Sequence, residues 1–189
     1  KKKKKFYHIA LTRAFLNSIR YGETTGGINQ TNKKPIVING DMQVQQRGDQ
    51  TGVSSAQYVN ADRFFINADN LGAYTFAASS DTPGFGFSKS MKIDCTTAGG
   101  SPGASDSLTI SQKFEGQDLQ LLKKGTANAE KITVAFWIKK KKTGTFIAEL
   151  YDHDNTRSCS KAYTVSSSNT WEHKVVNFPA DTTGAFGDD

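Results

Sequence analysis

The densest group of polar side chains that could carry chemistry lies at residues 149–155, which read Glu-Leu-Tyr-Asp-His-Asp-Asn. These carboxylates could hold a calcium ion or act as an acid–base pair. The spacing of an EF-hand calcium loop is missing, because no Gly stands at the sixth position from Asp152 and Tyr163 replaces the bidentate Glu. Asp and Asn also favour turns, and this segment falls between two predicted strands. We therefore interpret it as a hairpin turn, with calcium binding and acid–base catalysis as the alternatives.

Other residue types that form reactive sites are scattered. The three histidines, His8, His153 and His173, lack the spacing of zinc ligands, and no nucleophile elbow or phosphate-binding loop occurs. The Gly-rich segment 84–87 has no strand-to-helix context, and we interpret it as a flexible entry to a strand. Cys95 and Cys159 are expected to be free thiols. The sequence thus predicts no metal, no cofactor and no enzymatic activity.

Trp137 is the residue most suggestive of binding. It lies in a predicted strand, 131–139, whose alternate positions are all apolar: Ile132, Val134, Phe136 and Ile138. Trp137 should therefore point to the opposite face. An exposed Trp often stacks on a sugar ring or anchors an interface, so Trp137 is a candidate carbohydrate or partner contact. The alternative is that both faces of this strand are buried.

The charge of the chain is concentrated in two lysine runs. The sequence has 24 basic and 18 acidic residues, and nine of the lysines stand at 1–5 and 139–142. Without them, 15 basic residues face 18 acidic ones, a net charge of −3. A nucleic-acid binder would spread its basic residues over one face, so we expect no nucleic-acid partner. We interpret the runs as a tag or as stand-in residues, with a basic arm for an acidic partner as the alternative.

Residues 1–34 differ in character from the remainder. A loose apolar face predicts a short helix at 9–20, followed by a Gly-, Thr- and Asn-rich extended segment to residue 34. No apolar run approaches the ~18 residues of a membrane span, so we expect no membrane insertion. We predict a docking arm that another chain orders, and that can be deleted without unfolding the remainder. Its contact residues would be Phe6, Tyr7, Leu11, Phe15, Leu16, Ile19 and Tyr21.

From residue 35 onwards, short alternating segments are separated by turn residues. About nine or ten strands spaced by ~8–14 residues predict an all-β antiparallel sandwich or barrel. Strands are expected at 42–47, 145–151, 157–165 and 171–178, among others, and 117–123 is expected to be a single helical turn. The period-2 alternation predicts a core that contains Met91, Ile93, Leu108, Ile110, Ile132, Val134, Phe136 and Ile138.

Five segments together resemble a family of tail-fibre and other virion structural proteins of tailed phages, notably phages of cyanobacteria. They are PIVINGDMQVQQRG at 35–48, DRFFI at 62–66, SLTISQKFEGQDLQLLKKGTANAEKITVAFWIK at 107–139, KTGTFIAELYD at 142–152 and AYTVSSSNTWEHKVVNFPADTTG at 162–184. The resemblance spans about four-fifths of the chain. It implies a jelly-roll β-sandwich at 35–189, similar to carbohydrate-binding modules. Family members continue with further strands after the segment at 181–184, so we expect the sandwich to be C-terminally incomplete.

The resemblance also implies a role in a virion. We expect a tail-fibre or adaptor protein that contacts other tail or capsid proteins. We also expect it to form a homo-oligomer, namely a trimer. One face of the sandwich would bind a glycan on the surface of the bacterial host. The alternative is a glycan-degrading depolymerase of the tailspike type, which would need two carboxylates across a groove. No acidic pair stands apart from turn chemistry in this sequence, and the resemblance implies no catalytic residues.

Overall fold

The computed structural model describes the backbone of residues 5–16 and all atoms of residues 36–186. This part of the chain is mainly β-structure, and every paired strand is antiparallel, which confirms the predicted all-β class. The elements are β1 (Lys5–Leu16), β2 (Gln50–Val53), β3 (Gln57–Tyr58), β4 (Phe65–Ala68), β5 (Gly72–Ser79), β6 (Ser90–Ala98), β7 (Leu108–Ser111), the 3-10 helix η1 (Gly116–Leu122), β8 (Ile132–Lys140), β9 (Gly144–Asp152), β10 (Arg157–Val165) and β11 (Trp171–Phe178).

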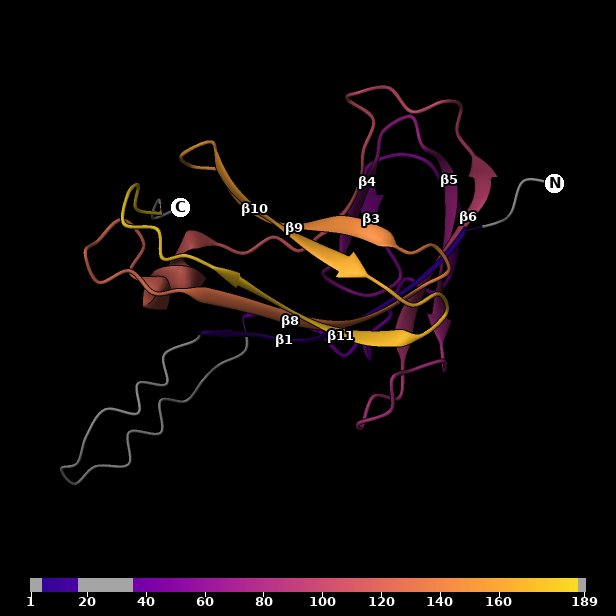
Figure 1. The fold of residues 1–189 in the computed structure, drawn as a ribbon, viewed down its shortest axis with the longest axis horizontal. Coiled ribbons are helices and arrows are strands. Elements are labelled where there is room, and N and C mark those ends of the chain that lie inside the picture. The colour runs from indigo at the N-terminus through magenta and orange to yellow at the C-terminus, as the bar shows by residue number, and fades with distance from the viewer. Residues whose placement is uncertain (1–4, 17–35, 187–189) are drawn as a thin grey trace.

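The largest sheet has six strands in the order β11-β8-β1-β6-β5-β2 (Figure 1). β1 is therefore a central strand, hydrogen-bonded to β6 on one side and to β8 on the other. The predicted helix at 9–20 is wrong for residues 9–16, which belong to a strand within this sheet and not to an arm separate from it. Deleting residues 1–34 would remove a central strand of the sheet, so we expect this deletion to unfold it, contrary to the prediction from the sequence. Residues 17–34 of the predicted arm lie outside the described residues.

The register of β1 explains why these residues form a strand. Ile9 and Leu11 stand opposite Ile138 and Phe136 of β8, both of which are buried. The register then shifts between Leu11 and Arg13, as in a β-bulge, where one extra residue faces no partner of its own. After this shift, apolar residues of β1 again stand opposite apolar residues of β8.

Two smaller sheets pack on the six-stranded sheet through separate hydrophobic clusters. The first sheet, β3-β4-β7, shares a cluster with β5 and β6 that includes Ile66, Phe76 and Ile93. The second, β9-β10, shares a cluster with β8 and β11 that includes Phe136 and Phe178. In Figure 1, the β9-β10 hairpin accordingly lies over β8 and β11. The fold thus has two cores that are joined by one continuous sheet.

The predicted core is confirmed in its central members. Met91, Ile93, Phe136 and Ile138 are buried in the two clusters. The other four predicted residues are only partly buried and pack against the clusters: Leu108, Ile110, Ile132 and Val134.

Turn chemistry sets most of the element boundaries. The helical turn predicted at 117–123 is confirmed by η1. Segment 42–47 forms no strand, although Met42 is fully buried, because it is held as a loop by contacts such as the bond from Asp62 N–H to the Val44 carbonyl. Among residues 5–16 and 36–186, no helix is long and apolar enough to cross a membrane.

Candidate functional site

Trp137 lies on the outer face of β8, as the alternation predicts. Its neighbours Phe136 and Ile138 are buried in the core, whereas Trp137 is half-buried on the opposite face of the six-stranded sheet. The β9-β10 hairpin covers only the inner face of this strand, so Trp137 on the outer face is covered by another part of the chain. This cover is the loop that joins β5 to β6.

Phe85 stacks on the Trp137 indole. The two ring centroids are 5.1 Å apart and the rings are inclined by only 17°. Phe85 has a φ of 53° and stands between Gly84 and Gly86, whose φ angles are 81° and 85°. Positive φ is uncommon for a bulky residue and persists where the surroundings enforce it. The loop therefore holds a large apolar ring in solvent, since Phe85 is 81% exposed.

His173 completes a group of three rings. It is the register partner of Trp137 on β11, and its ring centroid is 5.0 Å from that of Trp137, with an inclination of 44°. His173 is exposed, and Val175, two residues further along the same strand, is 55% exposed. We call Phe85, Trp137 and His173 the aromatic platform.

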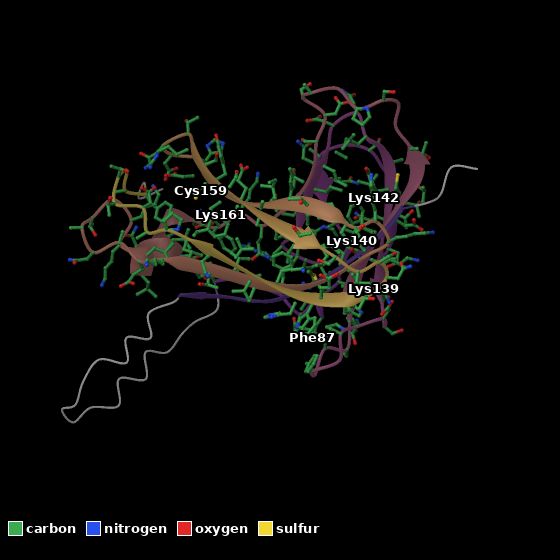
Figure 2. All side chains as sticks on the ribbon, viewed as in Figure 1. Phe87, Lys139, Lys140, Lys142, Cys159 and Lys161 are labelled. Atoms are coloured by element: carbon green, nitrogen blue, oxygen red, sulfur yellow. The ribbon has the colours of Figure 1, made fainter. Side chains whose placement is uncertain are left out.

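A polar group adjoins the aromatic platform at one end of β8. Asp81 accepts a hydrogen bond from Nε1 of Trp171 at 3.0 Å, and its other carboxylate oxygen lies 2.6 Å from Nζ of Lys139. The Ser90 hydroxyl donates to the Asp81 carbonyl at 2.7 Å, which fixes the start of the loop that carries Phe85. In Figure 2, Lys139 on β8 is drawn just above Phe87 of that loop. Charged donors and acceptors thus lie beside exposed rings.

The β10–β11 connection fixes the position of Trp171. Glu172 accepts hydrogen bonds from the N–H groups of Ser166 and Ser167 at 3.0 and 2.6 Å. The bond from the Lys174 side chain, together with these backbone bonds, lowers the pKa of Glu172 against the effect of burial. The Ser168 hydroxyl donates to the Lys141 carbonyl at 2.7 Å, so this loop is also tied to the end of β8.

Two lysines of the second run have defined structural positions. Lys139 pairs with Asp81, as described above. Lys140 is buried on the inner face, with Nζ 3.0 Å from the centroid of the Phe146 ring. Both lysines continue β8 and pair in register with β1. The interpretation of this run as a tag has no support in the packing of these two side chains.

The polar segment at 149–155 covers the end of β9 and most of the turn that leads to β10, which confirms the predicted hairpin. Asp152 forms a salt bridge with Lys124 and accepts a hydrogen bond from Nδ2 of Asn155 at 2.8 Å. Lys124 also lies 3.4 Å from Asp181, which follows β11. The cluster therefore fastens the tip of the hairpin to the segment after β11.

The ionisation of Asp152 fits this structural role. Burial alone would raise the pKa of Asp152, but hydrogen bonds from Lys124 and Asn155 lower it below the ordinary value of 3.8. Glu149 is exposed, and its carboxylate accepts a hydrogen bond from the Ser160 hydroxyl at 2.8 Å on the neighbouring strand. Hydrogen bonds and a salt bridge within the fold thus account for the positions of both carboxylates, and neither position needs a bound substrate as its explanation.

The remaining predicted site residues fall into two groups. Phe6, Tyr7, Leu11, Phe15 and Leu16 lie in β1, whereas Ile19 and Tyr21 lie outside the described residues. Within the described part of the chain, no group of three His, Cys, Asp or Glu residues is placed to hold a metal ion. Cys95 and Cys159 are free, as predicted.

Trp137 is predictable from the sequence as a candidate contact, but its partners in the aromatic platform are not. Phe85 belongs to a segment interpreted as a flexible strand entry, and His173 was noted only for lacking zinc-ligand spacing. The alternating Gly-Phe-Gly-Phe at 84–87 was the available signal, because an apolar ring between two glycines in a loop has no core to enter. No family model, curated protein or solved structure matches the chain.

Proposed function

We propose that this chain is a non-catalytic structural component of a phage virion, of the tail-fibre type, that binds a glycan of the bacterial surface. The observation that carries the binding function is the aromatic platform, in which an 81% exposed Phe85 stacks on Trp137. The resemblance of five sequence segments to virion structural proteins supports the place of the protein in a particle.

The chemistry of the aromatic platform suits a sugar. One face of a pyranose ring is lined by C–H groups and stacks on an aromatic face, while its hydroxyls need polar partners. Phe85 covers Trp137, so the sugar contacts the free face of Phe85, and Trp137, which itself packs against His173, supports that ring from below. Asp81 and Lys139 provide an acceptor and a donor at the margin of the same surface.

The finer architecture is part of this proposal. The antiparallel strands, in one large and two small sheets, are compatible with a jelly-roll sandwich of the carbohydrate-binding-module type. Because β1 is used within the six-stranded sheet, attachment to tail or capsid proteins does not depend on residues 5–16 as a free arm. We propose assembly as a homotrimer in the virion.

A binding measurement tests the glycan function. Purified capsular polysaccharide and lipopolysaccharide of the host are titrated against the wild type, Phe85→Ala and Trp137→Ala. Both substitutions should weaken binding by roughly two- to tenfold, since an aromatic contact contributes about 0.5–1.5 kcal/mol. Leu121→Ala is the control, because Leu121 is 66% exposed on η1, outside the aromatic platform. Equal affinity of all four proteins would contradict the proposed site.

Two further measurements test the other parts of the proposal. Mass spectrometry of purified particles should detect the chain, and its absence from particles would refute a virion component. Incubation with the bound polysaccharide should release no new reducing ends. A release that disappears in Glu149→Gln or Asp152→Asn would instead establish a depolymerase.

A further inference from the structure

A second group of aromatic side chains, accompanied by cations, lies on the outer face of the β3-β4-β7 sheet. Tyr58 of β3 and Phe65 of β4 are register partners, with ring centroids 5.2 Å apart and an edge-to-face angle of 78°. Ile66 and Ala68 of β4 are buried in the core, so the alternation of the strand places Phe65 on the opposite, outer face.

A cation lies over each of the two rings. Cζ of Arg47 is 5.4 Å from the centroid of Tyr58, and Nζ of Lys113 is 4.9 Å from that of Phe65. Asp62 orients Arg47 through a contact of 3.4 Å to Nη1, and the same carboxylate accepts a bond from the Gln46 N–H at 3.1 Å. We call Arg47, Tyr58, Phe65 and Lys113 the cation–aromatic row.

This row is accessible to a ligand. Tyr58 is 43% exposed, the Arg47 side chain is 46% exposed, and Lys113 is also exposed. A guanidinium has five donors, and the contact of Arg47 to Asp62 uses only one of its nitrogens, so other donors of the partly exposed Arg47 side chain are available to a ligand. The surface therefore combines partly exposed aromatic rings with a cation over each of them.

We propose that the cation–aromatic row is a second saccharide site, selective for acidic sugars such as uronates. The sugar ring would lie against Tyr58, and its carboxylate would pair with Arg47 or Lys113. A charge-assisted bond of this kind is stronger than a neutral one, and a planar guanidinium matches a carboxylate in a bidentate manner. The row lies on the β3-β4-β7 sheet, whereas the aromatic platform lies on the six-stranded sheet. The proposed second site therefore does not depend on glycan binding at the aromatic platform.

Charge balance favours a saccharide over a nucleic acid. Binding along a nucleic-acid backbone needs several phosphate contacts from a basic stripe. The chain outside the two lysine runs has 15 basic and 18 acidic residues, and the acidic Asp62 lies beside Arg47 of the row. The two cations of the row suffice for one or two carboxylates of an acidic sugar, but they do not form the basic stripe that a nucleic-acid backbone needs.

The experiment titrates a polygalacturonate oligosaccharide against the full chain and its variants by calorimetry. Tyr58→Ala and Lys113→Gln should each weaken binding by roughly five- to tenfold. Lys161→Gln is the matched control, because Lys161 is an exposed lysine on β10, away from the row (Figure 2). Trp137→Ala should bind polygalacturonate as the wild type does.

The outcomes separate this inference from the proposed function. Loss in Tyr58→Ala and Lys113→Gln, with Lys161→Gln and Trp137→Ala unaffected, supports the second site even if the aromatic platform binds no glycan. The inference is overturned if polygalacturonate does not bind, or if a neutral dextran oligosaccharide binds equally well. It is also overturned if Lys161→Gln weakens binding as much as Lys113→Gln, or if single-stranded DNA binds more tightly than the sugar.

Discussion

Replacing His8 by Pro is the sharpest test of the central position of β1. His8 stands opposite Lys92 of β6 and Lys139 of β8, so a strand faces its backbone on either side. Whichever way its N–H points, an acceptor strand is present there. Proline has no N–H and fixes φ near about −65°, far from the value of about −140° that is typical of an antiparallel strand.

The cost follows from these two defects. Removing the donor leaves a buried carbonyl of the neighbouring strand unsatisfied, which costs about 1–3 kcal/mol. The forced change of φ and the clash of the ring add to this, so we expect a total loss of about 3 kcal/mol or more. Native domains are stable by only about 5–15 kcal/mol, so the substitution removes a large fraction of that stability.

Urea unfolding monitored by tryptophan fluorescence measures this loss. Trp137 and Trp171 lie on β8 and β11 of the same sheet and report its disruption. With an m-value of about 1–3 kcal/mol/M, the midpoint of His8→Pro should fall by about 1–3 M. His8→Ala is the control, because it keeps the backbone N–H. If the two variants unfold at the same urea concentration, β1 is not hydrogen-bonded in the middle of the sheet.

Two further predictions concern the salt-bridge cluster and a tight turn. The lowered pKa of Asp152 means that the folded state favours the ionised carboxylate, so its contribution to stability is present above the ordinary value of 3.8 and is lost as the pH falls through the lowered value. Unfolding midpoints measured against pH should therefore decline less steeply on the acid side in Asp152→Asn than in the wild type, and identical slopes would exclude this role. Gly72→Ala should destabilise the fold by about 1–3 kcal/mol, because a Cβ at this residue (φ +93°) would lie 2.0 Å from the Thr97 carbonyl oxygen. Gly100→Ala, where a Cβ would meet nothing within 4 Å, should unfold thermally like the wild type, and an equal loss in both variants would contradict the argument.

The sequence predicts the second half of the fold well. β10 and β11 have the predicted bounds, 157–165 and 171–178, and β8 and β9 differ from prediction by one residue at each end. These strands follow one another as antiparallel elements with turn residues between them. Alternation and turn signals are local properties of the chain, so they are sufficient for such strands.

β1 was missed because its alternation is interrupted. Tyr7, Ile9 and Leu11 follow a period of two, but the shift between Leu11 and Arg13 changes the phase, and Phe15-Leu16 then places two apolar residues side by side. Spaced in this way, the apolar residues fit a loose helical face. Only the pairing with distant strands decides between the two structures, and a single sequence does not show that pairing.

The candidate site was predicted only in part, for a similar reason. The alternation of β8 places Trp137 on the outer face, because Phe136 and Ile138 define the inner one. The position of Phe85 depends on three consecutive positive φ angles in a loop, and no periodicity encodes them. The proximity of His173 to Trp137 depends on the register between β8 and β11, which the sequence does not fix.

The central position of β1 has a consequence for the synthesis of the chain. A ribosome produces this strand before β6 and β8, which supply both of its neighbours and lie some 80 to 130 residues further along. Pairings over such separations form slowly, because the entropy of closing the loop is lost before the contacts form. Both edges of β1 therefore remain unpaired while the intervening residues are translated. Unpaired strand edges favour pairing between nascent chains. The yield of folded protein should therefore increase with slow translation at low temperature, because fewer nascent chains then have an unpaired β1 at any one time.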